Sequence, residues 1–93
     1  MIILDTNVIS EAMSPSPNAK LSRWLSDQPT SLLFTTTISL AEILYGIELL
    51  PSGKRRSGLL VTAENTFPKL FAARILTFDE AAARAFASTR RPP

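Results

Sequence analysis

The sequence predicts an α/β fold in which a parallel sheet is flanked by helices. Three short runs rich in apolar, β-branched or aromatic residues, at residues 2–4, 32–37 and 74–78, alternate with segments of helical periodicity. Strands that alternate with helices favour parallel pairing through helical crossovers. The chain has 93 residues, of which 45% are hydrophobic and 19% are charged, and this balance fits one small globular domain.

The first half of the chain predicts two strands and three helices. Asn18 is a good helix N-cap, and Pro29 breaks the helix that follows it. The Pro51-Ser52-Gly53 stretch ends the third helix. In order, we expect a strand at 2–4, a helix at 8–13, a helix at 19–28, a strand at 32–37 and a helix from about 40 to 50.

The second half predicts two helices around a third strand. A helix with a basic start runs from Lys54 to about Phe67, where Pro68 interrupts or ends it. The run at 74–78 is the third strand, and an Ala-rich helix follows over 79–89.

The residue types that are missing restrict the chemistry. The chain has no cysteine and no histidine, so disulfides, thiolate metal sites and catalysis by Ser-His-Asp or Cys-His arrangements are excluded. Residues 1–50 contain five acidic and two basic residues, whereas residues 51–93 contain three acidic and eight basic ones. An acidic cluster can hold a cation, and a basic segment can attract a polyanion.

Two carboxylates are expected at one edge of the sheet. Asp5 follows the first strand, and Glu42 lies in the first turn of the helix after the second strand. Ligands of parallel α/β sheets bind outside the carboxyl ends of the strands. Paired carboxylates suit Mg²⁺ or Mn²⁺, and such an ion can activate water for attack on a phosphodiester.

Structural roles compete with this interpretation. Ser39 to Glu42 also fits a capping box, and Asp5 fits an ordinary N-cap. Asp79 follows the third strand and could join the other two carboxylates. Residues 77–80 form another potential capping box, in which Thr77 would be the cap and Asp79 a first-turn acid.

Three motifs carry a family resemblance: MIILDTNVISE at residues 1–11, ISLAEILYGI at 38–47 and RILTFD at 74–79. In this order they resemble PIN-domain ribonucleases, in particular the VapC toxins and their FitB-like branch, over essentially the whole chain. The resemblance implies the sheet order 3-2-1-4-5. It also implies that Asp5 and Glu42 help to hold Mg²⁺ or Mn²⁺, with Thr6 and Asn7 as supporting polar residues. Because strand 3 is at the edge of that sheet, Asp79 becomes a structural cap.

The chain departs from the family pattern at its C-terminal end. PIN domains carry a third acidic residue, and often a fourth, in a part of the fold that would follow Pro93. We therefore expect residues 1–93 to be the N-terminal portion of a single PIN-like domain, truncated at the C-terminus, with strands 1–3 present and strands 4–5 absent. A fragment, a truncated gene and a frameshift remain alternatives.

The functional expectation is the toxin component of a type II toxin–antitoxin pair. It would be a metal-dependent endoribonuclease, impaired by the missing acids, whose partners are RNA and a cognate antitoxin. Lys54, Arg55 and Arg56 would contact RNA phosphates, or would form only a solvated helix start. The alternatives are a non-catalytic module that binds an antitoxin or a second chain, and a structural fragment without a function of its own.

The remaining expectations concern association and location. The strand at 2–4 would lack a neighbour on one side, and an uncovered apolar edge favours a homodimer or other self-association. No run of residues has the pattern of a signal peptide or the length of a membrane span. We therefore expect a cytoplasmic protein without a membrane partner.

Overall fold

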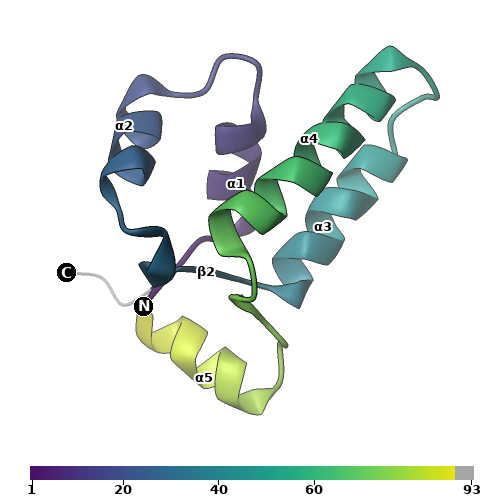
Figure 1. The fold of residues 1–93 in the computed structure, drawn as a ribbon. Coiled ribbons are helices and arrows are strands. Elements are labelled where there is room, and N and C mark those ends of the chain that lie inside the picture. Colours follow the sequence, from purple (N-terminus) through teal and green to yellow (C-terminus); the bar gives the residue numbers. More distant parts are fainter. Residues whose placement is uncertain (90–93) are drawn as a thin grey trace.

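A computed structural model describes residues 1–89 and confirms the α/β fold with a parallel sheet flanked by helices. Helices α1 to α4 lie above strand β2 in Figure 1, and α5 lies below it. None of the helices in residues 1–89 is long and apolar enough to cross a membrane. The elements are β1 (Ile2–Ile3), α1 (Thr6–Met13), α2 (Ala19–Asp27), the 3₁₀ turn η1 (Thr30–Leu32), β2 (Leu33–Thr36), α3 (Thr37–Glu48), α4 (Lys54–Phe71), β3 (Ile75–Leu76) and α5 (Glu80–Thr89).

The sheet described in residues 1–89 has three parallel strands in the order β1-β2-β3. This arrangement confirms the expected order for strands 1–3, with β3 two strands away from β1. Within the described residues β1 pairs with β2 alone. The register pairs Ile2 with Leu33, Ile3 with Phe34, Thr35 with Ile75 and Thr36 with Leu76.

The hydrophobic core lies between the sheet and helices α1, α3 and α4. In α3 the buried positions are Ser39, Ile43 and Ile47, whose spacing of four residues places them on one face of the helix. The rings of Phe67 and Phe71 in α4 lie with their centroids 5.5 Å apart. The core cluster is completed by small and aliphatic residues from several elements: Leu4, Ile9, Leu33 and Ala63.

Two helices near the sheet begin earlier than expected. Helix α1 starts at Thr6 instead of residue 8, because Asp5 caps it. Helix α3 starts at Thr37 instead of near residue 40, because the Thr36 hydroxyl accepts a hydrogen bond from the Ser39 N–H at 3.1 Å. Helix α3 therefore begins directly where β2 ends, and two residues separate the end of β1 from the start of α1, so the first turns of both helices lie beside the sheet edge.

Helix α4 continues through Pro68, although it was expected to end near residue 67. Proline lacks an N–H and removes one hydrogen bond within a helix, but Phe67 and Phe71 on either side are 5% and 0% exposed. Burial of these two rings favours continuation of the helix. The helix ends at Phe71, and its C-cap, Ala72, has a φ of 45° and donates its N–H to the Pro68 carbonyl at 3.0 Å.

Candidate metal-binding site

Asp5 has a structural role as well as its position at the sheet edge. It follows β1 and is the N-cap of α1, where its Oδ1 accepts a hydrogen bond from the Val8 N–H at 3.0 Å. The positive end of the helix dipole favours a carboxylate at this position. The side chain is half-buried, so the end of β1 and the start of α1 together restrict where the carboxylate can lie.

Glu42 is oriented by a contact with α1 and not by its own helix start. Its Oε1 accepts a hydrogen bond from the Thr6 hydroxyl at 2.9 Å. The alternative in which Ser39 to Glu42 form a capping box is ruled out, because Thr36 caps α3 and the Glu42 carboxylate accepts a hydrogen bond from Thr6 instead. This hydrogen bond joins the first residue of α1 to the second turn of α3. Glu42 was expected in the first turn and lies in the second, because α3 begins at Thr37.

Asp5 and Glu42 line the same cavity, which has a volume of about 370 Å³ and is open to solvent. It lies at the carboxyl ends of the strands, where α/β sheets bind their ligands. Thr6 and Asn7 also line it, as expected for supporting polar residues. Sequence reasoning did not select the four remaining lining residues, Thr36, Ile38, Ser39 and Phe78, although each lies at or just after the end of a strand.

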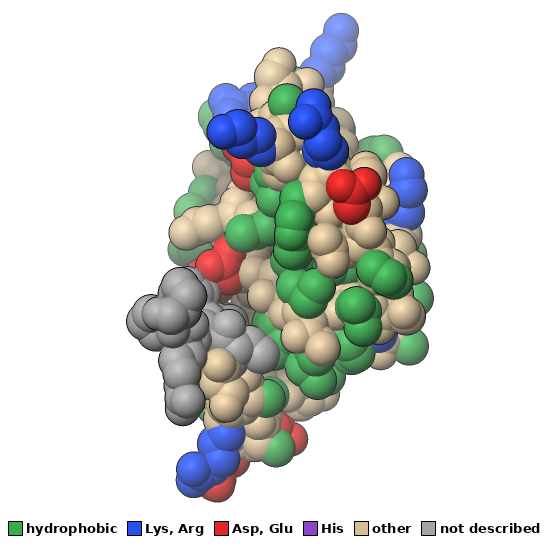
Figure 2. Space-filling model, turned by 90° about the vertical axis from the view of Figure 1, so that its left-hand side faces the viewer, with side chains coloured by type: hydrophobic (Ala, Val, Ile, Leu, Met, Phe, Trp, Pro, Cys, Tyr) green, Lys and Arg blue, Asp and Glu red, His purple; other side chains and the backbone are tan. Residues whose placement is uncertain are grey.

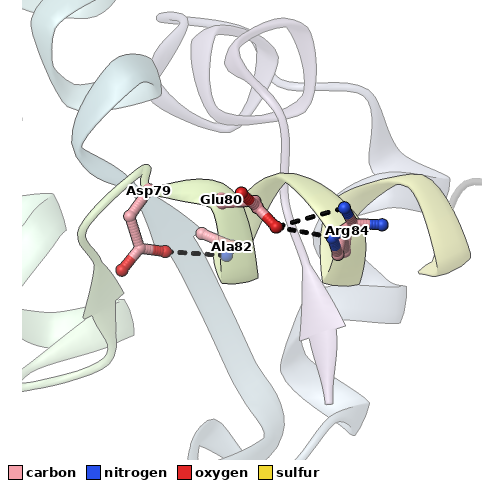
Figure 3. Close-up of polar contacts among 4 residues, drawn as sticks. All are labelled: Asp79, Glu80, Ala82 and Arg84. Atoms are coloured by element: carbon pink, nitrogen blue, oxygen red, sulfur yellow. Dashed lines mark hydrogen bonds and ion pairs between the residues drawn. The ribbon is translucent and has the colours of Figure 1, made fainter.

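Asp79 is not among the residues that line this cavity. Its Oδ1 accepts a hydrogen bond from the Ala82 N–H at 2.9 Å, so it caps α5 (Figure 3). Glu80 forms an ion pair with Arg84 at 3.1 Å and does not complete a capping box with Thr77. Asp79 is therefore the structural cap that the strand order implied. Within residues 1–89 no group of three or more Asp or Glu side chains comes together as a metal site.

The side chains that line the cavity fit a hard divalent cation. Carboxylates from two elements lie beside hydroxyl groups and an amide, and all of these offer oxygen atoms. Such oxygen donors are the ligands that Mg²⁺ and Mn²⁺ prefer. A carboxylate has about four acceptor positions, so the hydrogen bond from Thr6 leaves Glu42 able to bind a cation as well.

The three cations at the start of α4 have different surroundings. The Arg56 guanidinium forms an ion pair with Glu48 on α3 at 2.6 Å. Arg55 lines a second cavity that also includes Thr6 and Glu42, and both Lys54 and Arg55 line a third cavity, which does not include Glu42. Of the three cations, Arg55 is therefore the one that lines a cavity together with Glu42. Arg56 is instead paired with Glu48 of the same chain.

Comparison with known proteins identifies close relatives over most of the chain. The PIN domain model matches residues 2–92. Plasmid stability protein StbB of Pseudomonas syringae pv. tomato is 42% identical over 87 residues, covering 94% of this chain and 63% of the relative. Toxin FitB of Neisseria gonorrhoeae is 41% identical over 90 residues, covering 97% and 65%. VapC ribonuclease Y4jK of Sinorhizobium fredii is 37% identical over 87 residues, covering 94% and 62%.

Solved structures agree with these relatives. The crystal structure of FitAcB from Neisseria gonorrhoeae contains a chain with a TM-score of 0.77 and 41% identity, covering 95% of this chain and 63% of that one. A structure of FitAB bound to an IR36 DNA fragment gives the same TM-score and identity, with 95% and 62% coverage. The chain thus spans a little under two thirds of the length of the relatives it matches. The resemblance read from the three sequence motifs is confirmed, and the chain belongs to the PIN-domain family.

Proposed function

We propose that the chain is the toxin component of a type II toxin–antitoxin pair and acts as a metal-dependent endoribonuclease. The observation that carries this proposal is that Asp5 and Glu42, from different elements, line one cavity at the carboxyl edge of a parallel sheet. The relatives named as a toxin and as a ribonuclease support the same activity.

Asp5 and Glu42 would hold the divalent cation, either Mg²⁺ or Mn²⁺. When bound there, it would supply Lewis-acid activation of water and charge neutralisation at the phosphodiester. Asp5 is held in place by its contact with the Val8 N–H. Thr6 orients Glu42 through its hydroxyl, and the Asn7 amide adds a polar group to the cavity wall.

The basic start of α4 supplies the contacts to the RNA backbone. Lys54, Arg55 and Arg56 lie in its first turn, and cationic side chains of this kind bind phosphates without reading the sequence of the strand. Arg56 also binds Glu48, so Lys54 and Arg55 are the cations with the fewest competing contacts among these three.

The activity is expected to be impaired in this chain. Two carboxylates leave most positions around Mg²⁺ to water, and the charge of further acidic ligands strengthens binding. Within residues 1–89 no third carboxylate joins Asp5 and Glu42. Weak metal binding and slow cleavage follow from this ligand set.

A second function is favoured by the apolar surface of the chain. Tyr45 on α3 and Leu49, the C-cap of α3, are 65% and 67% exposed, and Val61 on α4 is 59% exposed. Figure 2 shows a further band of hydrophobic side chains on the face that carries α2, where Trp24 is 41% exposed. Exposed apolar surface of this kind marks binding sites for other proteins. In this alternative the chain is non-catalytic and only binds an antitoxin or a second copy of itself.

The proposal also covers the domain to which the chain belongs, its substrate and its partners. We take residues 1–93 to be the N-terminal portion of one PIN-like domain, with RNA as the substrate and a cognate antitoxin as the protein partner. The unpaired side of β1 within residues 1–89 supports self-association, because exposed strand edges recruit other chains. A cytoplasmic location stays a prediction.

The experiment that tests the enzymatic proposal is cleavage of labelled single-stranded RNA by the purified chain, with Mg²⁺, with Mn²⁺ and with EDTA. We expect slow cleavage that requires the divalent ion and is lost in Asp5→Asn and in Glu42→Gln. Asp79→Asn is the matched control, because it removes the same charge from a residue that caps α5 outside the cavity.

Cleavage that persists in both Asp5→Asn and Glu42→Gln would overturn the assignment of the site. Absence of cleavage by the folded wild-type chain under all conditions would overturn the enzymatic proposal for this chain and favour the binding module. Fast Mg²⁺-dependent cleavage, abolished in Asp5→Asn, would retain the site and refute the impairment.

A further inference from the structure

The carboxylate cavity continues into a longer groove between α1, α3 and α4. It shares Thr6 and Glu42 with a second cavity of about 360 Å³. The second cavity in turn shares residues of α1, the loop after it and α4 with a third cavity of about 610 Å³. We call the second and third cavities together the α1–α3–α4 groove; the residues that they share are Met13, Ser14, Pro15, Arg55 and Leu59.

The groove follows one side of α3 and continues past the C-terminal end of the helix. Glu42 and Gly46 line it, and their spacing of four residues places them one turn apart on the same side of α3. Leu50, two residues beyond the end of α3, also lines the groove. At a rise of 1.5 Å per residue, the helical part from Glu42 to Gly46 is about 6 Å long, which accommodates about two nucleotides of a stacked strand at about 3.4 Å per nucleotide.

Gly46 leaves the floor of the groove open. A Cβ atom built on this glycine meets no atom within 4 Å. Its backbone is helical, with no positive φ that would require glycine. Glycine in an exposed helix interior is less stable than alanine, so the advantage of glycine at this position is the space that it leaves above the helix.

The chemistry changes from one end of the groove to the other. Glu42 lies in the second cavity, at the end that adjoins the carboxylate cavity. Arg55 lines both the second and the third cavity, and Lys54 lines the third. The first turn of α4 contains no acidic residue, and its N-cap, Gly53, forms no side-chain cap hydrogen bond. Helix N-termini favour anions, so both this helix start and the cations favour a negatively charged group there.

The middle of the groove has apolar walls. Met13, Ile47 and Leu59 line it from three different helices. Apolar side chains of this kind can pack against the flat faces of unpaired bases. The groove therefore combines a surface for bases with a phosphate-binding end, and it opens from the cavity in which we place the cleaved bond.

We infer that the α1–α3–α4 groove binds the single-stranded RNA that extends from the carboxylate cavity, with Gly46 keeping the path open and Arg55 binding a backbone phosphate. This inference rests on the proposed ribonuclease function and adds the path of the substrate. It also separates the roles of the neighbouring arginines: Arg55 contacts RNA, and Arg56, paired with Glu48, supports the packing of α4 on α3.

The test measures binding of a short fluorescein-labelled single-stranded RNA by anisotropy, in EDTA to prevent cleavage and over a range of salt concentrations. Gly46→Leu fills the groove, and Ala41→Leu is its control, an exposed position on the same helix that does not line the groove. Arg55→Gln removes the phosphate contact. Its control is Arg84→Gln, which removes the same charge from α5, where the side chain is 78% exposed.

We expect Gly46→Leu to weaken RNA binding about tenfold through a steric clash. We expect Arg55→Gln to make the plot of log K for RNA association against log salt concentration less steep by about 0.7, the value for one phosphate contact to a single strand. Both controls retain the wild-type affinity and slope. Gly46→Ala, whose added methyl group meets no atom within 4 Å, retains the helix and raises its melting temperature, because alanine is more stable than glycine in an exposed helix interior. This variant shows that the position tolerates a side chain.

The inference would be overturned if Gly46→Leu, Arg55→Gln and both controls all bound RNA with the affinity and salt dependence of the wild-type chain. The RNA would then leave the carboxylate cavity by another path, and the groove would be a candidate binding site for a polypeptide. The ribonuclease proposal would be unaffected. Absence of RNA binding by the wild-type chain would instead count against the ribonuclease proposal, and the inference would fall with it.

Discussion

Replacement of Asp5 separates its structural role from its proposed catalytic role. Its Oδ1 accepts the Val8 N–H at the start of α1, and it lines the cavity with Glu42. Asparagine is as good an N-cap as aspartate, whereas alanine cannot accept the hydrogen bond. Asp5→Asn therefore removes the charge and retains the cap, and Asp5→Ala removes both.

The magnitudes follow from these contacts. Loss of an N-cap costs about 1 kcal/mol, within a range of about 0.5–2 kcal/mol, so Asp5→Ala lowers the free energy of unfolding by about this amount. In a domain of this size, about 1 kcal/mol corresponds to a decrease of about 4–8 °C in Tm. Asp5→Asn loses the attraction between the carboxylate and the helix dipole, about 0.3–1 kcal/mol, and removal of a negative charge near Glu42 offsets part of that loss.

The assay is thermal and urea denaturation followed by circular dichroism, for both variants and the wild-type chain in EDTA. We expect Asp5→Asn to unfold close to the wild type and Asp5→Ala to unfold several degrees lower. Equal destabilisation by both variants would refute the capping argument. A wild-type Tm in Asp5→Ala would show that the contact with Val8 contributes nothing to stability.

The remaining predictions concern the contacts around the site and the core. Thr6→Val removes the hydroxyl that donates to Glu42 at 2.9 Å, and we expect Mn²⁺ affinity, measured by titration calorimetry, to fall by about 1 kcal/mol; an unchanged affinity would show that the carboxylate needs no orientation. Phe71 is fully buried, so Phe71→Ala costs about 3–5 kcal/mol in urea denaturation, and a loss below about 1 kcal/mol would contradict the packing described. Glu48→Gln breaks the ion pair with Arg56, but because the Glu48 side chain is 70% exposed, we expect the free energy of unfolding to fall by less than about 1 kcal/mol; a larger loss would mean that this pair has a larger role in packing α4 on α3.

Much of the fold was predictable because periodicity and strand–helix alternation are local signals. The three strands and five helices occur in the predicted order, and Asp5 and Glu42 lie at one cavity, as their positions after successive strands indicated. Position relative to strand ends was sufficient here, because parallel strands bring their carboxyl ends to one edge of a sheet.

The errors arose where tertiary contacts decide between local alternatives. Ser39 to Glu42 has the pattern of a capping box. Thr36, the last residue of β2, lies three residues before Ser39 and caps α3 itself, so Glu42 contacts Thr6 instead. Pro68 is a helix breaker by its local chemistry, yet α4 continues beyond it to the buried Phe71. Neither outcome depends on nearby residues alone.

The site residues that sequence reasoning missed have no pattern of their own. Phe78 lines the cavity because β3 lies beside β2. Its N–H donates a hydrogen bond to the Thr37 hydroxyl at the start of α3, and residues adjacent to Phe78 in the sequence do not indicate this distant partner. The ion pair of Arg56 with Glu48 similarly depends on the packing of α4 against α3. The different surroundings of Arg55, which lines a cavity with Glu42, and Arg56, which pairs with Glu48, become visible only in the folded chain.

The central claim is that Asp5 and Glu42 together hold a divalent cation, and electron paramagnetic resonance of Mn²⁺ tests it most directly. The disappearance of the free-ion signal on titration with the purified chain reports bound Mn²⁺. We predict weak binding of one ion per chain, lost in Asp5→Asn and in Glu42→Gln and retained in Asp79→Asn, since that side chain caps α5 outside the cavity. Binding that survives both of the first two substitutions, or that is lost equally in the third, would contradict the assignment of this site.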